Sequence, residues 1–98
     1  MKLNETQKKY LRDKGHLLKP IITISNQGLS QPLIDEYEST ITHHELIKIR
    51  IRNHDRESKN IIFDQLCEQT SAQLVGKIGN IALVYRLNKE NQKIKLPK

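Results

Sequence analysis

The sequence has few of the residues that several classes of protein require. Tryptophan is absent, phenylalanine occurs once and tyrosine three times, so aromatic platforms for stacking bases are few. Cys67 is the only cysteine. It excludes an internal disulfide, and a lone thiol is typical of a reducing compartment. No apolar run approaches the roughly 18 residues that a membrane-spanning helix needs.

The N-terminal sequence turns polar immediately after Leu3. A secretory signal peptide needs an apolar segment near this point, so none is expected. Together with the cysteine count and the short apolar runs, this predicts a cytoplasmic protein that does not contact membranes.

Motifs for metal binding and catalysis are also missing. The candidate metal ligands are four histidines and Cys67. The adjacent pair His43 and His44 lacks the i, i+4 spacing of helical zinc motifs, and no paired-cysteine knuckle occurs. The sequence has no Walker loop, G-x-G-x-x-G motif or nucleophile elbow. We therefore expect no metal, cofactor, small-molecule substrate or catalytic residue. Cys67, on a mostly apolar stretch, is interpreted as a buried thiol.

What is present fits one small domain. The chain has 98 residues, of which 36% are hydrophobic and 29% charged, enough for one modest core. We expect a domain over residues 1–88, a loose basic tail over residues 89–98 in which only Ile94 and Leu96 dock, and a monomer.

The charge is distributed in blocks. The net charge is +6. Residues 1–19 carry +4, residues 20–47 carry −4 with no lysine or arginine, residues 48–60 carry +3, residues 61–76 carry −2 and residues 77–98 carry +5. Alternating signs predict a molecule with a basic side suited to a polyanion. An ordinary charged, soluble surface is the alternative.

The first half of the chain predicts two helices and a strand. Asn4 and Gln7 form a capping-box pattern for a helix that reaches about Lys14, with Gly15 just beyond its end. Residues 21–24 are β-branched and predict a short strand. Ser30 then caps a second helix whose apolar stripe is Leu33, Ile34, Tyr37 and Ile41.

The second half predicts three strands and one helix. Residues 46–52 alternate isoleucine with the cations Lys48, Arg50 and Arg52, which predicts a sheet covered on one face only. A polar turn over residues 53–59 leads to a helix with a stripe of Ile61, Ile62 and Leu66. Residues 72–78 and 81–87 predict a hairpin. The fold class is therefore α+β, a two-layer fold with the order α-β-α-β-α-β-β. Its mixed four-stranded sheet packs on three helices, with parallel crossovers and an antiparallel hairpin.

Two features suggest a phosphate-binding surface. The loop formed by Ser25, Asn26, Gln27 and Gly28 joins a strand to a helix N-terminus, where backbone N–H groups and the helix dipole attract phosphate. Gly28 would let a sugar-phosphate backbone approach closely. An ordinary connecting turn is the alternative.

The second feature is a row of cations. Lys48, Arg50 and Arg52 share one strand face, and Arg56 and Lys59 continue the row. Such a row binds a polyanion or simply keeps a strand face solvated and protected from edge pairing. No pair of aromatic residues on the predicted strands supports base stacking on the sheet.

A set of ordered segments resembles the CRM (chloroplast RNA splicing and ribosome maturation) domain, and in particular its stand-alone bacterial YhbY-type members. The resemblance extends over nearly the whole chain and rests on residues 18–22, 27–29, 43–49, 55–57, 75–77 and 83–86.

The resemblance implies a fold similar to the C-terminal domain of translation initiation factor three. It also implies an RNA-binding domain that associates with precursors of the large ribosomal subunit and aids their assembly without catalysis. In the family the strand-to-helix loop reads G-x-x-G. Here Ser25 replaces the first glycine, Asn26 and Gln27 are the variable pair, and Gly28 keeps the last. A serine that needed a positive φ would cost about 1 kcal/mol.

The sequence therefore predicts a non-enzymatic protein that binds ribosomal RNA by its shape. One alternative is a module whose basic side docks on an acidic ribosomal or translation protein. The other is a small hydrolase or RNA-modifying enzyme, for which the sequence offers no nucleophile–base set. The predicted RNA-binding residues are Lys19, Ser25, Asn26, Gln27, Gly28, Lys48, Arg50, Arg52 and Arg56, and the tail cations Lys89, Lys93 and Lys95 would extend their footprint.

Overall fold

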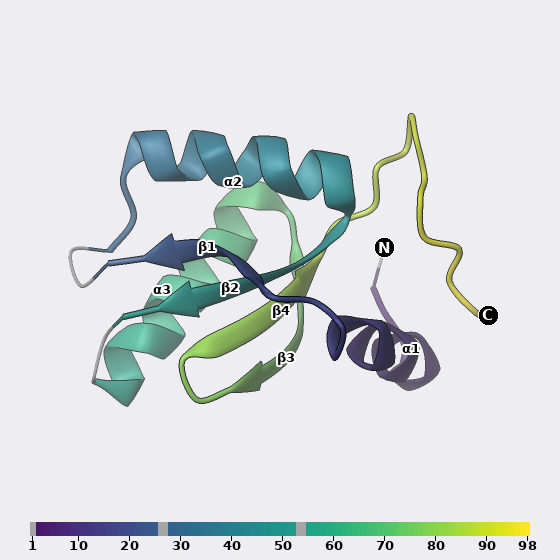
Figure 1. The fold of residues 1–98 in the computed structure, drawn as a ribbon, viewed down its shortest axis with the longest axis horizontal. Coiled ribbons are helices and arrows are strands. Elements are labelled where there is room, and N and C mark those ends of the chain that lie inside the picture. The colour runs from purple at the N-terminus through teal and green to yellow at the C-terminus, as the bar shows by residue number, and fades with distance from the viewer. Residues whose placement is uncertain (1, 26–27, 53–54) are drawn as a thin grey trace.

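The computed structural model describes residues 2–25, 28–52 and 55–98. Helices and strands follow the predicted order (Figure 1). The elements are α1 (Glu5–Gly15), β1 (Pro20–Ile24), α2 (Gln31–His44), β2 (Leu46–Ile51), α3 (Arg56–Thr70), β3 (Gln73–Ile78) and β4 (Ile81–Tyr85).

The four strands form one mixed sheet in the order β1-β2-β4-β3. β1 and β2 are parallel, whereas β4 is antiparallel to both β2 and β3. β4 therefore lies between β2 and β3. The connection through α3 joins β2 to β3 and passes over β4. The α+β class, the parallel crossovers and the terminal hairpin are confirmed.

The predicted starts of α1 and α2 are confirmed by their caps. The Asn4 side chain accepts from the Gln7 backbone N–H, and the Gln7 side chain accepts from the Asn4 N–H. Ser30 caps α2. The prediction for Gly15 is wrong, because this residue lies inside α1. It packs on the sheet, where an added Cβ would lie 2.6 Å from Leu83 Cδ2.

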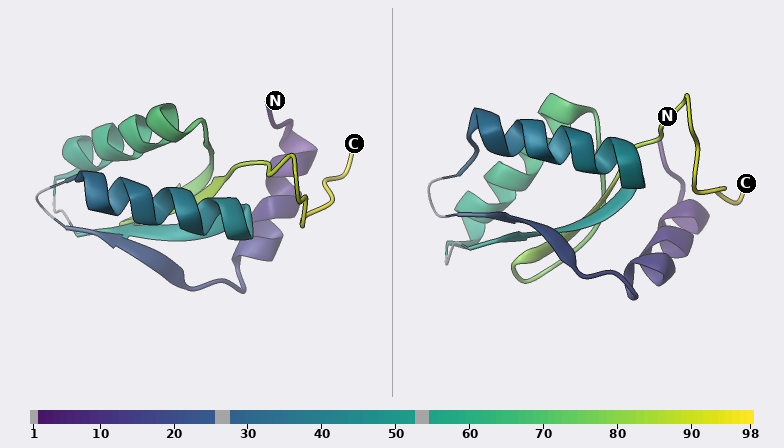
Figure 2. Two further views of the ribbon diagram at one scale, coloured as in Figure 1. Left: turned by 90° about the horizontal axis from the view of Figure 1, so that it is seen from above. Right: turned by 45° about the horizontal axis from the view of Figure 1, so that its top comes forward.

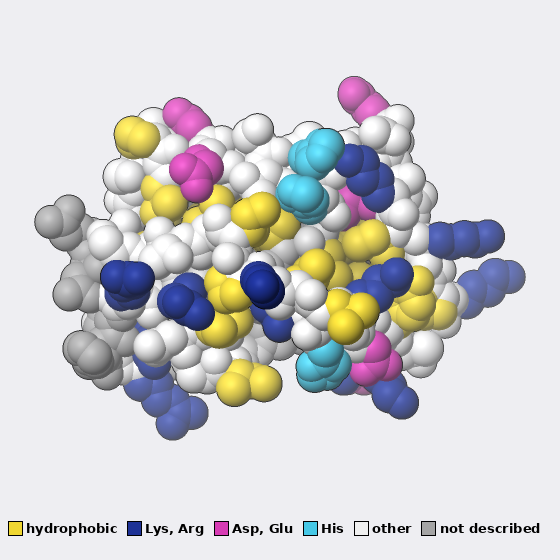
Figure 3. All heavy atoms as spheres, in the orientation of Figure 1, with side chains coloured by type: hydrophobic (Ala, Val, Ile, Leu, Met, Phe, Trp, Pro, Cys, Tyr) yellow, Lys and Arg dark blue, Asp and Glu magenta, His cyan; other side chains and the backbone are white. Residues whose placement is uncertain are grey.

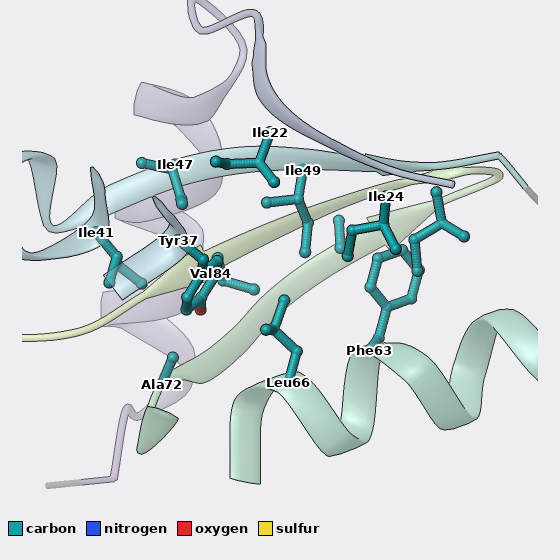
Figure 4. Close-up of a cluster of buried hydrophobic side chains, with 12 residues drawn as sticks. Ile22, Ile24, Tyr37, Ile41, Ile47, Ile49, Phe63, Leu66, Ala72 and Val84 are labelled. Carbon is teal, nitrogen blue, oxygen red and sulfur yellow. The ribbon is translucent and has the colours of Figure 1, made fainter. Parts of the chain in front are cut away.

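The main core lies between one face of the sheet and the helix pair α2 and α3, which lie side by side (Figure 2). Tyr37 and Ile41 of α2 and Phe63 and Leu66 of α3 are buried. They meet alternate residues of the strands (Figure 4), namely Ile22, Ile24, Ile47, Ile49, Ile51, Ala82 and Val84.

The other face of the sheet is partly covered, contrary to the prediction of a sheet covered on one face only. Leu3 precedes α1 and Leu11 lies within it. Both pack against Leu46, Leu83 and Tyr85 at one end of this face. The alternation in β2 alone predicts a solvent-exposed second face with cations. β4 places Leu83 and Tyr85 on the same face, however, and these apolar side chains have to be covered. α1 supplies that cover and leaves the rest of the face open (Figure 2).

The apolar stripe of α3 differs from the predicted one. α3 begins at Arg56, inside the segment predicted to be a turn. Phe63 and Leu66 face the sheet, whereas Ile61 is 50% exposed. Three consecutive apolar residues do not fix the phase of a helix, and here the second and third, Ile62 and Phe63, contact the core.

The C-terminal segment is fastened to the domain by a buried glutamate. The Glu45 carboxylate is fully buried and accepts the backbone N–H groups of Asn88, Lys93 and Ile94 at 2.6–2.8 Å. Ile94 and Leu96 pack on the cluster under α1, as predicted. The prediction of a loose tail is wrong, because Glu45 holds the backbone of this segment. In the described residues, no helix has both the length and the apolar character needed to cross a bilayer.

Candidate nucleic-acid interface

The loop after β1 bends back at Gly28. The Gly28 N–H donates to the Ser25 carbonyl at 3.0 Å, and Gly28 has a φ of 85°. This left-handed conformation strongly favours glycine. An added Cβ would meet only Ile62 Cδ1, at 4.0 Å. Glycine is therefore required here by backbone conformation and not by lack of space. Asn26 and Gln27 lie outside the described residues.

Ser25 departs from the G-x-x-G pattern of the family loop. Outside glycine, the positive φ angles recorded in the described part of the chain belong to Glu45 and Ser71. The cost expected for a serine in the left-handed region therefore does not apply to Ser25. The residue is exposed, and its hydroxyl is a hydrogen-bond donor of the kind that binds phosphate.

The N-terminus of α2 adds positive character beside this loop. Ser30 caps it, and its hydroxyl accepts the Leu33 N–H at 3.4 Å. The first turn of α2 contains no acidic residue, so the helix dipole is not neutralised locally.

The N-terminus of α3 differs because its cap is a carboxylate. Asp55 accepts from the Ser58 hydroxyl at 2.6 Å and from the Glu57 N–H. These hydrogen bonds, chiefly the one from Ser58, lower the pKa of Asp55, which therefore stays ionised at neutral pH. Of the two helix N-termini, α2 is the better one for an anion.

Two predicted cations lie on the open part of the second sheet face. Lys48 pairs with Leu83 of β4, and Arg50 pairs with Thr23 of β1 and Ile81 of β4. Arg50 is exposed and Lys48 is half-buried. Neither has a salt bridge to another described residue.

Arg52 connects this face to the loop. Its backbone N–H donates to the carbonyl of Ile24, the residue before Ser25, at 2.8 Å. Lys19 is exposed and precedes Pro20, which pairs with Lys48. We call the set of Lys19, Lys48, Arg50 and Arg52 the cationic face.

Arg56 does not share this face. It is exposed at the start of α3, on the side of the sheet that the α2 and α3 helices cover. Of the predicted residues that the structure describes, Lys19, Ser25, Gly28, Lys48, Arg50 and Arg52 lie on β2, beside β1 or in the loop after β1, and Arg56 lies apart from them.

The space-filling view separates the charges. Lysine and arginine side chains follow β1 and β2 in a row with hydrophobic side chains between them, whereas acidic side chains lie above them over α2 (Figure 3). Asp35 and Glu36 of α2 are exposed. Glu38 instead pairs with Arg86 at 2.7 Å. On the face in view, a row of cations therefore lies beside the acidic residues of α2, and an acidic side chain also lies below the row (Figure 3).

The aromatic residues do not form a stacking platform. Tyr37, Phe63 and Tyr85 are fully buried. Tyr10 is half-buried on α1, where the Lys14 ammonium lies 5.1 Å from its ring centre. Contacts to bases on the open sheet face would have to come from aliphatic side chains.

Sequence reasoning missed a cleft between α1 and the open sheet face. Arg12 and His16 line one side, and Lys48 with apolar residues of β3 and β4 lines the other. Nothing in the local sequence places α1 on this face. Lys48 and Leu83 line the cleft together because β2 pairs with β4. That pairing depends on the strand order, which the local sequence does not reveal.

The described residues offer little for catalysis. They contain no group of three or more histidine, cysteine, aspartate or glutamate side chains that could hold a metal ion. Burial, together with the nearby Asp64, raises the pKa of Cys67 to about 11, so its thiol is protonated at neutral pH and is a poor nucleophile.

Comparison with known proteins gives consistent matches over the full length. A model of the CRS1/YhbY (CRM) domain matches residues 3–86. A Pseudomonas aeruginosa protein, the probable RNA-binding protein PA4753, is 38% identical over 95% of this chain and 89% of its own. An RNA-binding protein of Haemophilus influenzae is 36% identical over 98% of this chain and 96% of its own.

A solved structure has the same fold. The solution structure of the hypothetical protein SAV1595 from Staphylococcus aureus superposes with a TM-score of 0.84 and 34% identity, covering 98% of this chain and 100% of the other. The domain match and the near full-length relatives confirm the predicted resemblance: this chain belongs to the CRS1/YhbY (CRM) domain family.

Proposed function

We propose that this protein is a non-enzymatic RNA-binding protein that binds ribosomal RNA in precursors of the large ribosomal subunit and aids their assembly. The observation that carries the proposal is the left-handed bend at Gly28, in the loop that follows Ile24, whose carbonyl accepts the backbone N–H of Arg52 of the cationic face. The names of the relatives, which describe RNA-binding proteins, support the same class of partner.

Phosphate contacts would come from two groups. The backbone at Gly28 and the N-terminus of α2, whose first turn holds no acidic residue, would meet one stretch of the RNA backbone, and the cationic face would meet a neighbouring stretch. Because Tyr37, Phe63 and Tyr85 are fully buried, the RNA would be recognised mainly by its shape. The ribosomal assignment rests on the CRM resemblance.

Crosslinking in cells followed by RNA sequencing tests the partner, and sedimentation identifies the particle. We expect crosslinks in large-subunit ribosomal RNA and co-sedimentation with particles lighter than the mature subunit. Crosslinks to other RNAs alone would overturn the ribosomal assignment, and an absence of crosslinks would overturn RNA binding.

A protein-docking module is the second candidate, because apolar side chains are exposed around the cationic face. Leu17 is 89% exposed, Ile21 is 50% exposed and Ile78 is 82% exposed. An acidic ribosomal or translation protein would complement this mixture. Pull-downs treated with ribonuclease separate the two functions: partners that are retained favour protein docking, and partners that are lost favour RNA.

A further inference from the structure

The cleft between α1 and the open sheet face is large enough to receive a nucleobase and has an apolar floor with cations at its rim. It encloses about 480 Å³. Ile81 and Leu83 of β4 and Ile78 of β3 form an apolar floor, with Gly15 and Arg12 of α1 opposite. All the lining residues belong to the described part of the chain.

Two glycines lie where α1 and the sheet meet beside the cleft. At Gly15 a Cβ would collide with Leu83, so α1 approaches the sheet closely only because this position has no side chain. At Gly76 a Cβ would lie 3.5 Å from Arg12 Cδ. The aliphatic stem of Arg12 therefore lies over β3, beside an irregularity in the pairing between Leu74 and Gly76.

The charges around the cleft have one sign. Arg12 and Lys48 are among its lining residues, no acidic residue is, and Arg50 is paired with Ile81 of the floor. A ligand that places negative charge at the rim and a flat, weakly polar group on the floor would satisfy both features. A nucleotide of an RNA chain has this chemistry, with its phosphate beside the cations and its base on the aliphatic side chains.

Base pairing decides which RNA can use the cleft. A base within a duplex is stacked and paired, and the shallow minor groove presents only edges to a protein. An unpaired nucleotide turns its base out of the helix at the lowest energetic cost, because no base pair has to be broken. Resting on the proposed function, we infer that this cleft receives one extruded base from a bulge or loop of the bound RNA, while the Gly28 loop and the cationic face hold the flanking backbone.

The test compares two RNA hairpins that differ by one chemical group. Both carry a single-nucleotide bulge, but one bulge is an adenosine and the other an abasic sugar, so the backbone is the same and only the base differs. Affinity is measured by fluorescence anisotropy at fixed salt. We expect the wild-type protein to prefer the adenosine bulge about tenfold, because the base buries apolar surface.

The variant Ile78→Ser removes an apolar side chain from the cleft without changing charge. Ile78 is 82% exposed, so the fold should not depend on it. We expect the preference for the adenosine bulge to vanish, with unchanged affinity for the abasic hairpin. The matched control Ile61→Ser changes an exposed isoleucine on α3 and should keep the preference. Thermal unfolding checks that both variants fold.

Three results would overturn the inference. Equal, salt-sensitive binding of both hairpins by the wild-type protein would reject the base site and leave the proposed function standing. A preference that survives Ile78→Ser would place the base elsewhere. Failure to bind either hairpin would reject RNA binding and the base site together.

Discussion

At the scale of single residues, Gly28 combines a backbone conformation that favours glycine with the RNA contact that we propose. With a φ of 85° and open space around its Cα, any other residue is strained by about 1 kcal/mol without a steric clash. We expect Gly28→Ala and Gly28→Asp to lower the free energy of unfolding by similar amounts, as measured by urea denaturation.

Affinity for RNA separates these two variants. Alanine adds only strain, whereas aspartate adds a negative charge where a phosphate is expected. We predict that Gly28→Asp binds a structured RNA about tenfold more weakly than Gly28→Ala. Equal affinities for the two variants would mean that phosphate does not approach this bend.

Cys67 provides a prediction about pH. Burial raises the pKa of its thiol from 9.0 to about 11 in the folded protein, so the folded state holds this proton more tightly than the unfolded state. The resulting stabilisation is present below pH 9 and is lost as the pH rises toward 11.

We expect the Cys67 thiol to react with a disulfide reagent more slowly than the glutathione thiol does at pH 7.5. Its reaction rate should increase as the pH rises. Over the same range, wild-type stability should fall more than that of Cys67→Ser. Rapid reaction at pH 7.5 would show that the thiol is not protected as described.

At the scale of elements, the C-terminal segment depends on one carboxylate. Glu45 accepts three backbone N–H groups of this segment while fully buried. We predict that Glu45→Ala lowers the free energy of unfolding by roughly 3 kcal/mol, because the donors lose a charged acceptor. The amides of Lys93 and Ile94 should then exchange quickly with solvent in hydrogen-exchange measurements.

Glu36→Ala is the matched control, because Glu36 is exposed on α2. Its effect on stability should stay within about 0.5 kcal/mol. If the Lys93 and Ile94 amides stayed protected in Glu45→Ala, the carboxylate would not be what fastens the segment.

The elements also show how far the sequence predicts the fold. The starts of α1 and α2 were predictable because caps such as Asn4 with Gln7 act over three residues, and β2 was predictable because alternation is local. The side of the sheet taken by α1 was not, because an amphipathic helix can cover either face. The burial of Glu45 was not predictable either, since its partners lie 43–49 residues away.

In the candidate site, too, the features set by local sequence were predictable and those set by long-range contacts were not. Residue types and loop position predicted Gly28 and the cations of β2, and the structure adds that Arg52 adjoins the end of β1. The cleft beside Lys48 was missed because it forms between α1 and β4, elements far apart in the chain.

At the scale of the whole molecule, charge separation predicts a steep dependence of RNA affinity on salt. Each phosphate neutralised by a lysine or arginine releases counterions. Replacing Arg52 with glutamine should reduce the slope of log affinity against log salt by roughly 0.7–0.9.

Lys98→Gln is the matched control, since it removes the same charge at the C-terminus, at the other end of the molecule from the Gly28 loop (Figure 1). We expect it to leave the slope unchanged. An equal reduction by both variants would indicate diffuse attraction to net charge instead of a defined face.

The central claim is that RNA lies on the cationic face and the Gly28 bend. NMR titration of the labelled protein with a structured ribosomal RNA hairpin tests it most directly. The account predicts that the amide signals of Ser25, Gly28, Arg50 and Arg52 shift most, while those of the acidic side of α2 stay in place. Largest shifts at Asp35 and Glu36 would contradict it.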